Sequence, residues 1–164
     1  MRLRRDNGAG GQTLPEVMVA AVLLGAFFAS IFELNAVCLR YIGASKEAVA
    51  AIAAVQDRTE TLRNLAFVDL TSVPYLQTTL ASPPNASEFA KNTTETVSLS
   101  AYPTATGTTR LTRHTDGSVT LDSTASSLGS TLVQLTVASS WNATFGSRAR
   151  NEQTTTIISN GTKK

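Results

Sequence analysis

The sequence predicts an α+β protein, with one long N-terminal helix whose second half packs on a small antiparallel β-sheet. Three observations predict this fold class. An apolar run without charge extends from residue 17 to 32, and an alanine-rich stretch with helical spacing of its apolar residues follows at 44–66. Segments of alternating apolar and polar residues then recur between 96 and 159. A chain of 164 residues has room for one compact domain and a long accessory segment.

The first eleven residues, MRLRRDNGAGG, form a basic leader without hydrophobic periodicity. Three arginines and one aspartate give this leader a formal charge of +2, which equals the charge of the whole chain, so the remainder sums to zero. Basic residues before an apolar helix favour a cytoplasmic N-terminus. Because no basic stripe occurs elsewhere, no nucleic-acid partner is expected.

The long helix is predicted to begin at about residue 14 and to end at about 65, within a helical region at 12–66 that is apolar to about 33 and then amphipathic. Thr13 and Glu16 have the spacing of a capping box, and Pro15 falls in the first turn, where its missing N–H costs nothing. The apolar run at 17–32 would rise about 24 Å, against about 30 Å for the hydrocarbon core of a bilayer. It therefore fits a signal sequence or a membrane anchor.

A signal-peptidase site is not expected after this run. Such a site needs two small residues with one residue between them, just beyond the apolar core. The stretch FFASIFELNAVCLRY offers no such pair. Cys38 is the only cysteine, so an internal disulfide is excluded. We expect this side chain to be a small residue buried at a helix contact.

The second half of the helix carries an apolar stripe surrounded by charged residues. The stripe consists of Val49, Ile52, Val55, Thr59, Leu62 and either Leu65 or Ala66. Around it lie Lys46, Glu47, Asp57, Arg58, Glu60 and Arg63. An antiparallel sheet with one apolar face needs a cover, and this stripe can provide it.

Residues 67–164 are predicted to form a small antiparallel β region, with an irregular connection at 67–95 in which Pro83-Pro84 excludes a helix. The strand candidates are 96–102, 109–114, 118–122, 131–141 and 150–159. Asp116-Gly117 is a strong hairpin signal between two of them. In the fourth candidate Leu132 is expected to face the core, with Leu135 or Val137 depending on register, and Trp141 is expected to pack in the core.

Catalytic and metal-binding chemistry is not predicted. His114 is the only histidine and is expected to face solvent on a strand, because no cysteine or second histidine is available to complete a site with it. Asp116 and Asp122 lack the dense ligand spacing of a calcium loop. We expect no enzyme activity and no cofactor.

The stretch GQTLPE before an apolar helix resembles the processing site of type IV pilins and type II secretion pseudopilins. In that family a glycine precedes the scissile bond and a glutamate is the fifth residue after it, which here are Gly11 and Glu16. The resemblance implies that prepilin peptidase cuts after Gly11, that Gln12 becomes the N-terminal residue and is N-methylated, and that Glu16 pairs with the α-amino group of a neighbouring subunit. The ending of the chain is similar to that of minor pilins and minor pseudopilins.

Three features depart from the family pattern. Gln12 stands where phenylalanine is usual, Glu33 stands where many major pilins have a helix-loosening proline, and no cysteine pair closes a C-terminal loop. Without that proline, a melted helical segment is not expected at Glu33.

The expected function is therefore that of a non-enzymatic minor pilin or pseudopilin, assembled into a type IV pilus or a type II secretion pseudopilus. The expected location is the bacterial inner membrane, as a single-pass protein with a cytoplasmic N-terminus, and then a periplasmic or surface filament. The expected partners are prepilin peptidase, other pilin or pseudopilin subunits and inner-membrane lipid. The alternative is a monomeric, signal-anchored periplasmic or surface domain that binds a ligand through a Ser/Thr-rich face. A small hydrolase ranks last, since no nucleophile–base pair can be assembled around His114.

Overall fold

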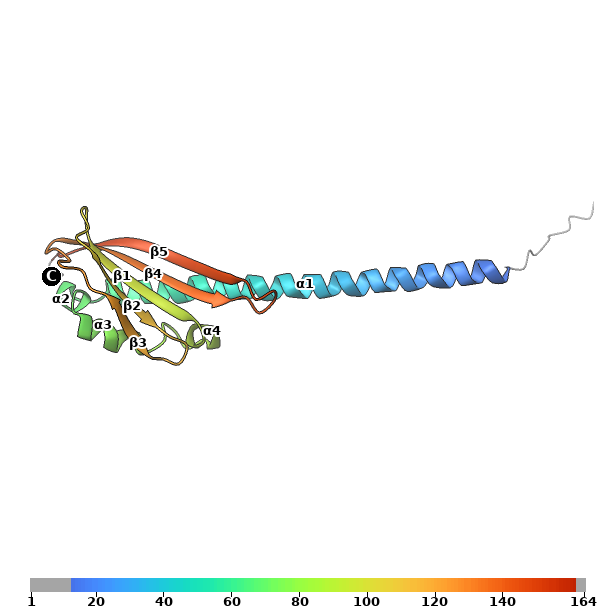
Figure 1. Ribbon diagram of the computed structural model, residues 1–164, viewed down its shortest axis with the longest axis horizontal. Coiled ribbons are helices and arrows are strands. Elements are labelled where there is room, and N and C mark those ends of the chain that lie inside the picture. Colours follow the sequence, from blue (N-terminus) through green and yellow to red (C-terminus); the bar gives the residue numbers. More distant parts are fainter. Residues whose placement is uncertain (1–12, 162–164) are drawn as a thin grey trace, which may run out of the picture. The chain divides into compact units, whose positions relative to one another are not determined.

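The computed structural model describes residues 13–161 and confirms the α+β class (Figure 1). Its helices are α1 (Leu14–Arg63), α2 (Phe67–Leu70), α3 (Val73–Leu80) and α4 (Glu88–Lys91). Its strands are β1 (Thr94–Ala101), β2 (Thr108–Arg113), β3 (Val119–Ser123), β4 (Leu132–Asn142) and β5 (Ala149–Ser159). The chain divides between Tyr41 and Ile42 into two units.

The second unit contains an open antiparallel sheet in the order β3-β2-β1-β4-β5, and part of α1 packs on it. The face of α1 that is buried here recurs every three or four residues, as expected for a helix on a sheet. Its members are Ala51, Ala54, Val55, Arg58, Thr59 and Leu62.

The predicted stripe is only partly this face. Val55, Thr59 and Leu62 are buried, whereas Ile52 keeps 41% of its surface exposed and Val49 keeps 63%. The buried face is rotated toward two small residues, Ala51 and Ala54. Alanine contributes little to a hydrophobic pattern, so the rotation has no strong signature in the sequence.

The core lies between the inner face of the sheet and the helices. Leu76 and Leu80 of α3 and Leu70 of α2 are fully buried in it. The strands contribute Val97, Leu99, Leu111, Val133, Leu135 and Val137.

The core-facing residues of β4 differ from the prediction at one position. Leu135 and Val137 pair with Leu99 and Val97 of β1 and are buried, but Leu132 is half-exposed and Val133 takes the inner position. Side chains on a strand alternate between faces, so placing Leu135 and Val137 inside puts Leu132 on the outer face.

The connection predicted as irregular contains the three short helices α2, α3 and α4. Pro74 lies at the start of α3, where proline is compatible with a helix, and Ser87 caps α4 by accepting a bond of 3.1 Å from the Ala90 N–H. Pro83-Pro84 lies between α3 and α4, in a stretch without helix as predicted.

The hairpin between β2 and β3 turns at Asp116-Gly117, as predicted. Gly117 has φ of +82°, in the region that glycine adopts at least cost. The Ser118 N–H donates to Asp116 Oδ1 over 2.9 Å, and the His114 N–H donates to the Ser118 carbonyl over 2.8 Å. These bonds close the turn.

Candidate membrane-spanning and assembly segment

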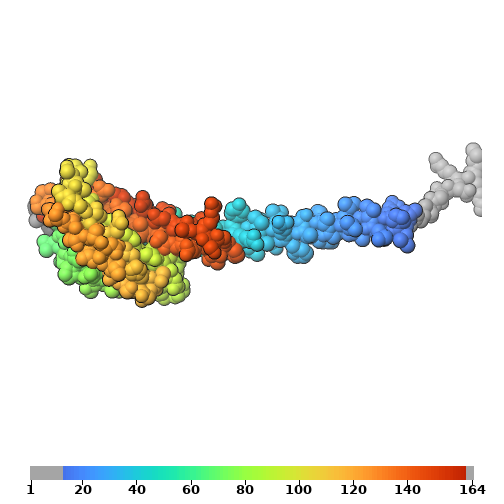
Figure 2. Space-filling model, in the orientation of Figure 1, coloured from blue at the N-terminus to red at the C-terminus, as the bar shows by residue number. Residues whose placement is uncertain are grey.

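The N-terminal unit contains α1 from Leu14 to Tyr41 (Figure 2), and its apolar side chains are exposed. Its large apolar residues, each at least 45% exposed, are Leu14, Val17, Met18, Val19, Val22, Leu23, Leu24, Phe27, Phe28, Ile31, Phe32, Leu34, Leu39 and Tyr41. In the described part of the chain, α1 is the helix that is long and apolar enough to cross a membrane. A helix that is apolar all round needs lipid or other helices about it.

Glu16 lies in the first turn of this helix, and its side chain is exposed. Its backbone N–H donates to the Thr13 carbonyl over 2.9 Å. Its carboxylate, however, makes no hydrogen bond or ion pair with any residue from 13 to 161. The side-chain bonds of the predicted capping box are therefore not formed between Thr13 and Glu16, and the helix begins on backbone bonds alone. This leaves the carboxylate available to a group outside the described residues.

The helix continues unbroken past Glu33, as the absence of a proline there predicts. The expectation for Cys38 is wrong: its side chain is exposed on α1. Burial of a small residue needs a second element beside the helix, and in the described residues none covers this stretch.

Gly11 and Gln12, the residues predicted to flank the processing site, lie outside the described residues. The structure therefore places only Glu16 of the three predicted site residues.

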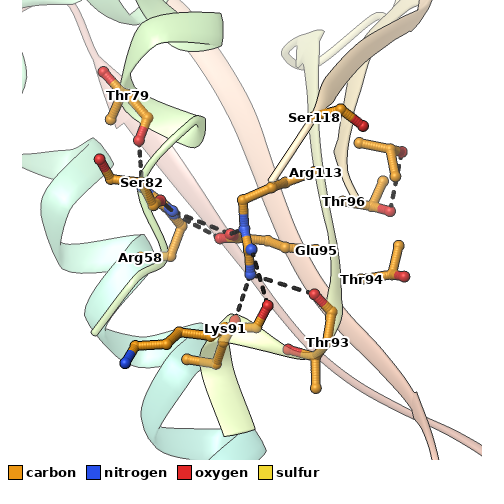
Figure 3. Close-up of polar contacts among 12 residues, drawn as sticks. Arg58, Thr79, Ser82, Lys91, Thr93, Thr94, Glu95, Thr96, Arg113 and Ser118 are labelled. Carbon is orange, nitrogen blue, oxygen red and sulfur yellow. Dashed lines mark hydrogen bonds and ion pairs between the residues drawn. The ribbon is translucent and has the colours of Figure 1, made fainter. Parts of the chain in front are cut away.

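A cluster of buried charges in the second unit was not predicted from the sequence (Figure 3). Glu95 of β1 accepts from Arg58 of α1, with 2.6 Å between Arg58 Nε and Glu95 Oε1. It also accepts from Arg113 of β2, with 3.3 Å between Arg113 Nε and Glu95 Oε2. The three side chains are each no more than 4% exposed.

The two guanidinium groups of this cluster also bind backbone carbonyls. Arg58 donates to the carbonyls of Thr79 and Ser82, and Arg113 donates to those of Ala90, Lys91 and Thr93. The cluster thus joins α1, β1 and β2 to α3, to α4 and to the residues that follow each of these two helices. Because it is closed to solvent and fully hydrogen-bonded, we interpret it as a structural clamp.

The alternation of inward and outward side chains along β1 and β2 was the sequence signal that could have revealed this cluster. Glu95 is in phase with Val97 and Leu99, and Arg113 is in phase with Leu111, so alternation alone directs both charges inward.

A second polar group lies at the end of β4. The Thr144 N–H and Trp141 Nε1 donate to the carboxylate of Glu47 over 3.1 and 3.3 Å. These bonds, those from Thr144 first, hold the pKa of Glu47 below its usual value. Trp141 is half-buried, with its ring edge-on to Phe89 at 5.3 Å, and so is not the core residue that was expected. Its ring borders an open cavity of about 560 Å³.

The remaining titratable candidates serve local structure. His114 is half-buried and its Nε2 lies 3.1 Å from the Thr120 hydroxyl. The carboxylate of Asp122 accepts from Thr112 over 2.6 Å and from Thr120 over 2.9 Å, which lowers its pKa, the bond from Thr112 first. Between residues 13 and 161, no three His, Cys, Asp or Glu side chains gather as a metal site would require.

The geometry defines a class of protein: a small α+β unit that follows an N-terminal helix able to cross a membrane. No protein-family model matches the chain, and no curated protein or solved structure is significantly similar to it.

Proposed function

We propose that this chain is a non-enzymatic pilin or pseudopilin subunit that is processed after Gly11 and assembled through α1 into a type IV pilus or type II secretion pseudopilus. The observation that carries the proposal is the carboxylate of Glu16. It lies at the start of an uncovered apolar helix without a partner in residues 13–161. The arrangement of a long apolar helix packed further along on an antiparallel sheet resembles that of pilins.

The cost of placing Glu16 in lipid explains why a partner is needed. A carboxylate costs about 2.5–3.5 kcal/mol at the centre of a membrane helix on insertion scales and less near a helix end, where Glu16 lies, and acidic residues within membrane segments are usually paired. Processing after Gly11 would create an α-amino group four residues before Glu16. The amine of one subunit paired with Glu16 of its neighbour would offset the cost and set the stagger between the two helices.

The same reasoning gives the topology. Arg2, Arg4 and Arg5 hold the leader in the cytoplasm, so prepilin peptidase acts on the cytoplasmic side of the inner membrane. The sheet then lies in the periplasm, and the assembled subunit lies in a filament there or on the cell surface.

The alternative is an anchored monomer that binds a ligand with the outer face of the sheet. This face is rich in hydroxyl groups, with Thr96 beside Thr112 at 3.3 Å and Thr136 beside Thr155 at 3.0 Å. Such a domain would use α1 only as an anchor, and Glu16 would then have no role in its placement.

The assembly role and the anchored monomer can be separated by one experiment. It quantifies the fraction of the chain that is found in filaments sheared from cells of its native host. We expect Glu16→Ala to lower the filament-bound fraction severalfold while the total amount of processed protein is unchanged. Glu33→Ala is the matched control, because it removes another exposed carboxylate from the same helix. A Glu16→Ala subunit that enters filaments like the wild type, or a wild-type chain absent from filaments, would refute the assembly role.

A further inference from the structure

Strand β5 forms a long open edge of the sheet. Its eleven residues pair with β4 over their whole length without a register shift, and no described residue pairs with its outer side. The opposite edge strand, β3, has only five residues. Sheets usually protect an edge of such length with proline, lysine or a bulge, because its free N–H and C=O groups are a template for another strand.

The side of α1 next to β5 is apolar and uncovered. Ala48 shares an open cavity of about 470 Å³ with Ala149, Arg150 and other residues at the start of β5. Ile52 lies one helical turn beyond Ala48 on the same row and is 41% exposed, and Val49 beside it is 63% exposed. These are the two residues of the predicted stripe that the sheet fails to cover. The five-stranded sheet therefore leaves these two apolar side chains exposed.

The edge also carries a polarity of charge. Arg148 and Arg150 are exposed at its start, and within residues 13–161 neither forms a salt bridge, although Arg150 interacts electrostatically with Glu47. Glu152 is the acidic residue of β5, and the two arginines outnumber it at this end of the strand. The second half of β5, from Thr154 to Ser159, is uncharged. A strand that fits this edge therefore has a carboxylate near the arginines and neutral residues after it.

We propose that the outer edge of β5 binds an extended segment of another protein as a sixth strand of the sheet. This segment carries an acidic residue opposite Arg148 or Arg150, apolar β-branched or leucine side chains toward Ile52 and Val49, and small hydroxyl side chains on the outer face. Backbone hydrogen bonds supply the affinity, and the alternate side chains supply the selectivity.

A second copy of β5 fits this edge less well. In full antiparallel pairing centred on Thr154, Arg150 would lie opposite Ile158, so the arginine would gain no carboxylate in that register. A copy shifted to place Arg150 opposite Glu152 would pair only part of β5, residues 149–153 in the antiparallel case. In parallel pairing in register, each Arg150 would lie opposite its own copy, and like charges directly opposite are unfavourable. The inference needs neither processing after Gly11 nor filament assembly.

The test uses the full chain in phosphatidylcholine nanodiscs and a labelled synthetic peptide as the probe. The peptide TETVSLSA, the sequence of β1, has the required chemistry when it pairs parallel to β5: an acidic residue near its N-terminus, beside the arginines, and then alternating hydroxyl and apolar side chains. We expect saturable binding by fluorescence anisotropy and slower hydrogen exchange in β5. Two control peptides are N-methylated, one on the odd-numbered residues and one on the even-numbered residues. Each lacks the N–H donors along one edge of the peptide, so the pair shows whether binding uses a single edge. Methylation of that edge should weaken binding at least tenfold.

Variants of the chain test the side-chain contacts. Arg148→Glu with Arg150→Glu should weaken binding about two- to fivefold, and a peptide with lysine in place of its glutamate should recover it. Ile52→Lys should weaken binding, whereas Val68→Lys, at an apolar residue of α2 that is 75% exposed, should not. The proposal is wrong if the peptide does not saturate, if both methylated peptides bind equally well, or if protection falls on another strand. It is also wrong if β5 is occupied by a second copy of the chain, seen as self-association that excludes the peptide.

Discussion

Replacing Glu95 by alanine removes the carboxylate that neutralises two buried guanidinium groups. Arg58 and Arg113 would stay closed to solvent, at 3% and 2% exposure of their side chains, with no counter-charge. Three charged hydrogen bonds would be lost, two from Arg58 at 2.6 and 3.1 Å and one from Arg113 at 3.3 Å. Removing one partner of a buried ion pair costs about 3–5 kcal/mol, because the remaining charge is left uncompensated.

The assay is urea unfolding of the full chain in detergent micelles. Trp141 is the only tryptophan, and it contacts Phe89 and Glu47 within the second unit, so its fluorescence reports on this unit. We expect Glu95→Ala to lower the free energy of unfolding by about 3 kcal/mol or more. That loss is a large share of the 5–15 kcal/mol typical of a domain.

The matched control is Glu60→Ala. Its carboxylate lies 3.1 Å from Arg63 Nη1, but the two side chains are 63% and 52% exposed, so the pair is worth about 0.2–1 kcal/mol. If Glu95→Ala and Glu60→Ala destabilise the chain equally, the reasoning that burial makes the difference is refuted.

Three further outcomes follow from single contacts. Ser139 has a buried hydroxyl without a hydrogen-bond partner among residues 13–161, so Ser139→Ala should leave the urea midpoint unchanged or raise it; a marked fall would reveal an unrecognised bond. Gly117→Val should destabilise the chain by about 1–2 kcal/mol in the same assay, because φ of +82° is strained for a β-branched residue, and an unchanged midpoint would contradict this. The pKa of Glu47 is lowered in the folded state, so its contribution to stability is complete above its unfolded pKa and is lost as pH falls through the lower folded value. Glu47→Gln should therefore flatten the acid limb of a stability–pH curve below about pH 4.5, and an unaltered limb would show that the bonds from Thr144 and Trp141 do not matter.

Much of the fold was predictable because its signals are local. The apolar run, the spacing of alanine and leucine and the lack of proline before Pro74 together indicate one helix, and α1 ends at Arg63, two residues before the predicted end. Alternation located all five strands, and Asp116-Gly117 located one hairpin. These signals need no knowledge of which strand lies beside which.

The errors arise where long-range packing decides. Whether Leu132 or Val133 faces the core depends on the phase of β4 against β1, and which face of α1 is buried depends on where the sheet and the short helices pack against it. The pairing of Arg58 with Glu95 joins residues 37 positions apart, and charged residues on a helix are ordinarily exposed. Trp141 contacts Phe89 at the end of the sheet, a contact that no local pattern encodes.

The candidate site was predictable in part for a different reason. The position of Glu16 before the apolar run is a local feature, and its lack of a partner within residues 13–161 became evident only from the structure. A partner supplied by another subunit is beyond what a single chain can display. The processing site at Gly11 and Gln12 stays a prediction.

The most direct test of the proposed function is intact-mass and N-terminal peptide analysis of the chain recovered from membranes or sheared filaments of cells that contain prepilin peptidase. The proposal predicts a mature chain that begins QTLPEV and carries one methyl group on its N-terminal Gln12. Gly11→Val should leave the uncleaved precursor in the membrane, whereas Gly8→Val in the same leader should be processed normally. An N-terminus beyond Phe32, as ordinary signal-peptidase cleavage would produce, would contradict the proposal.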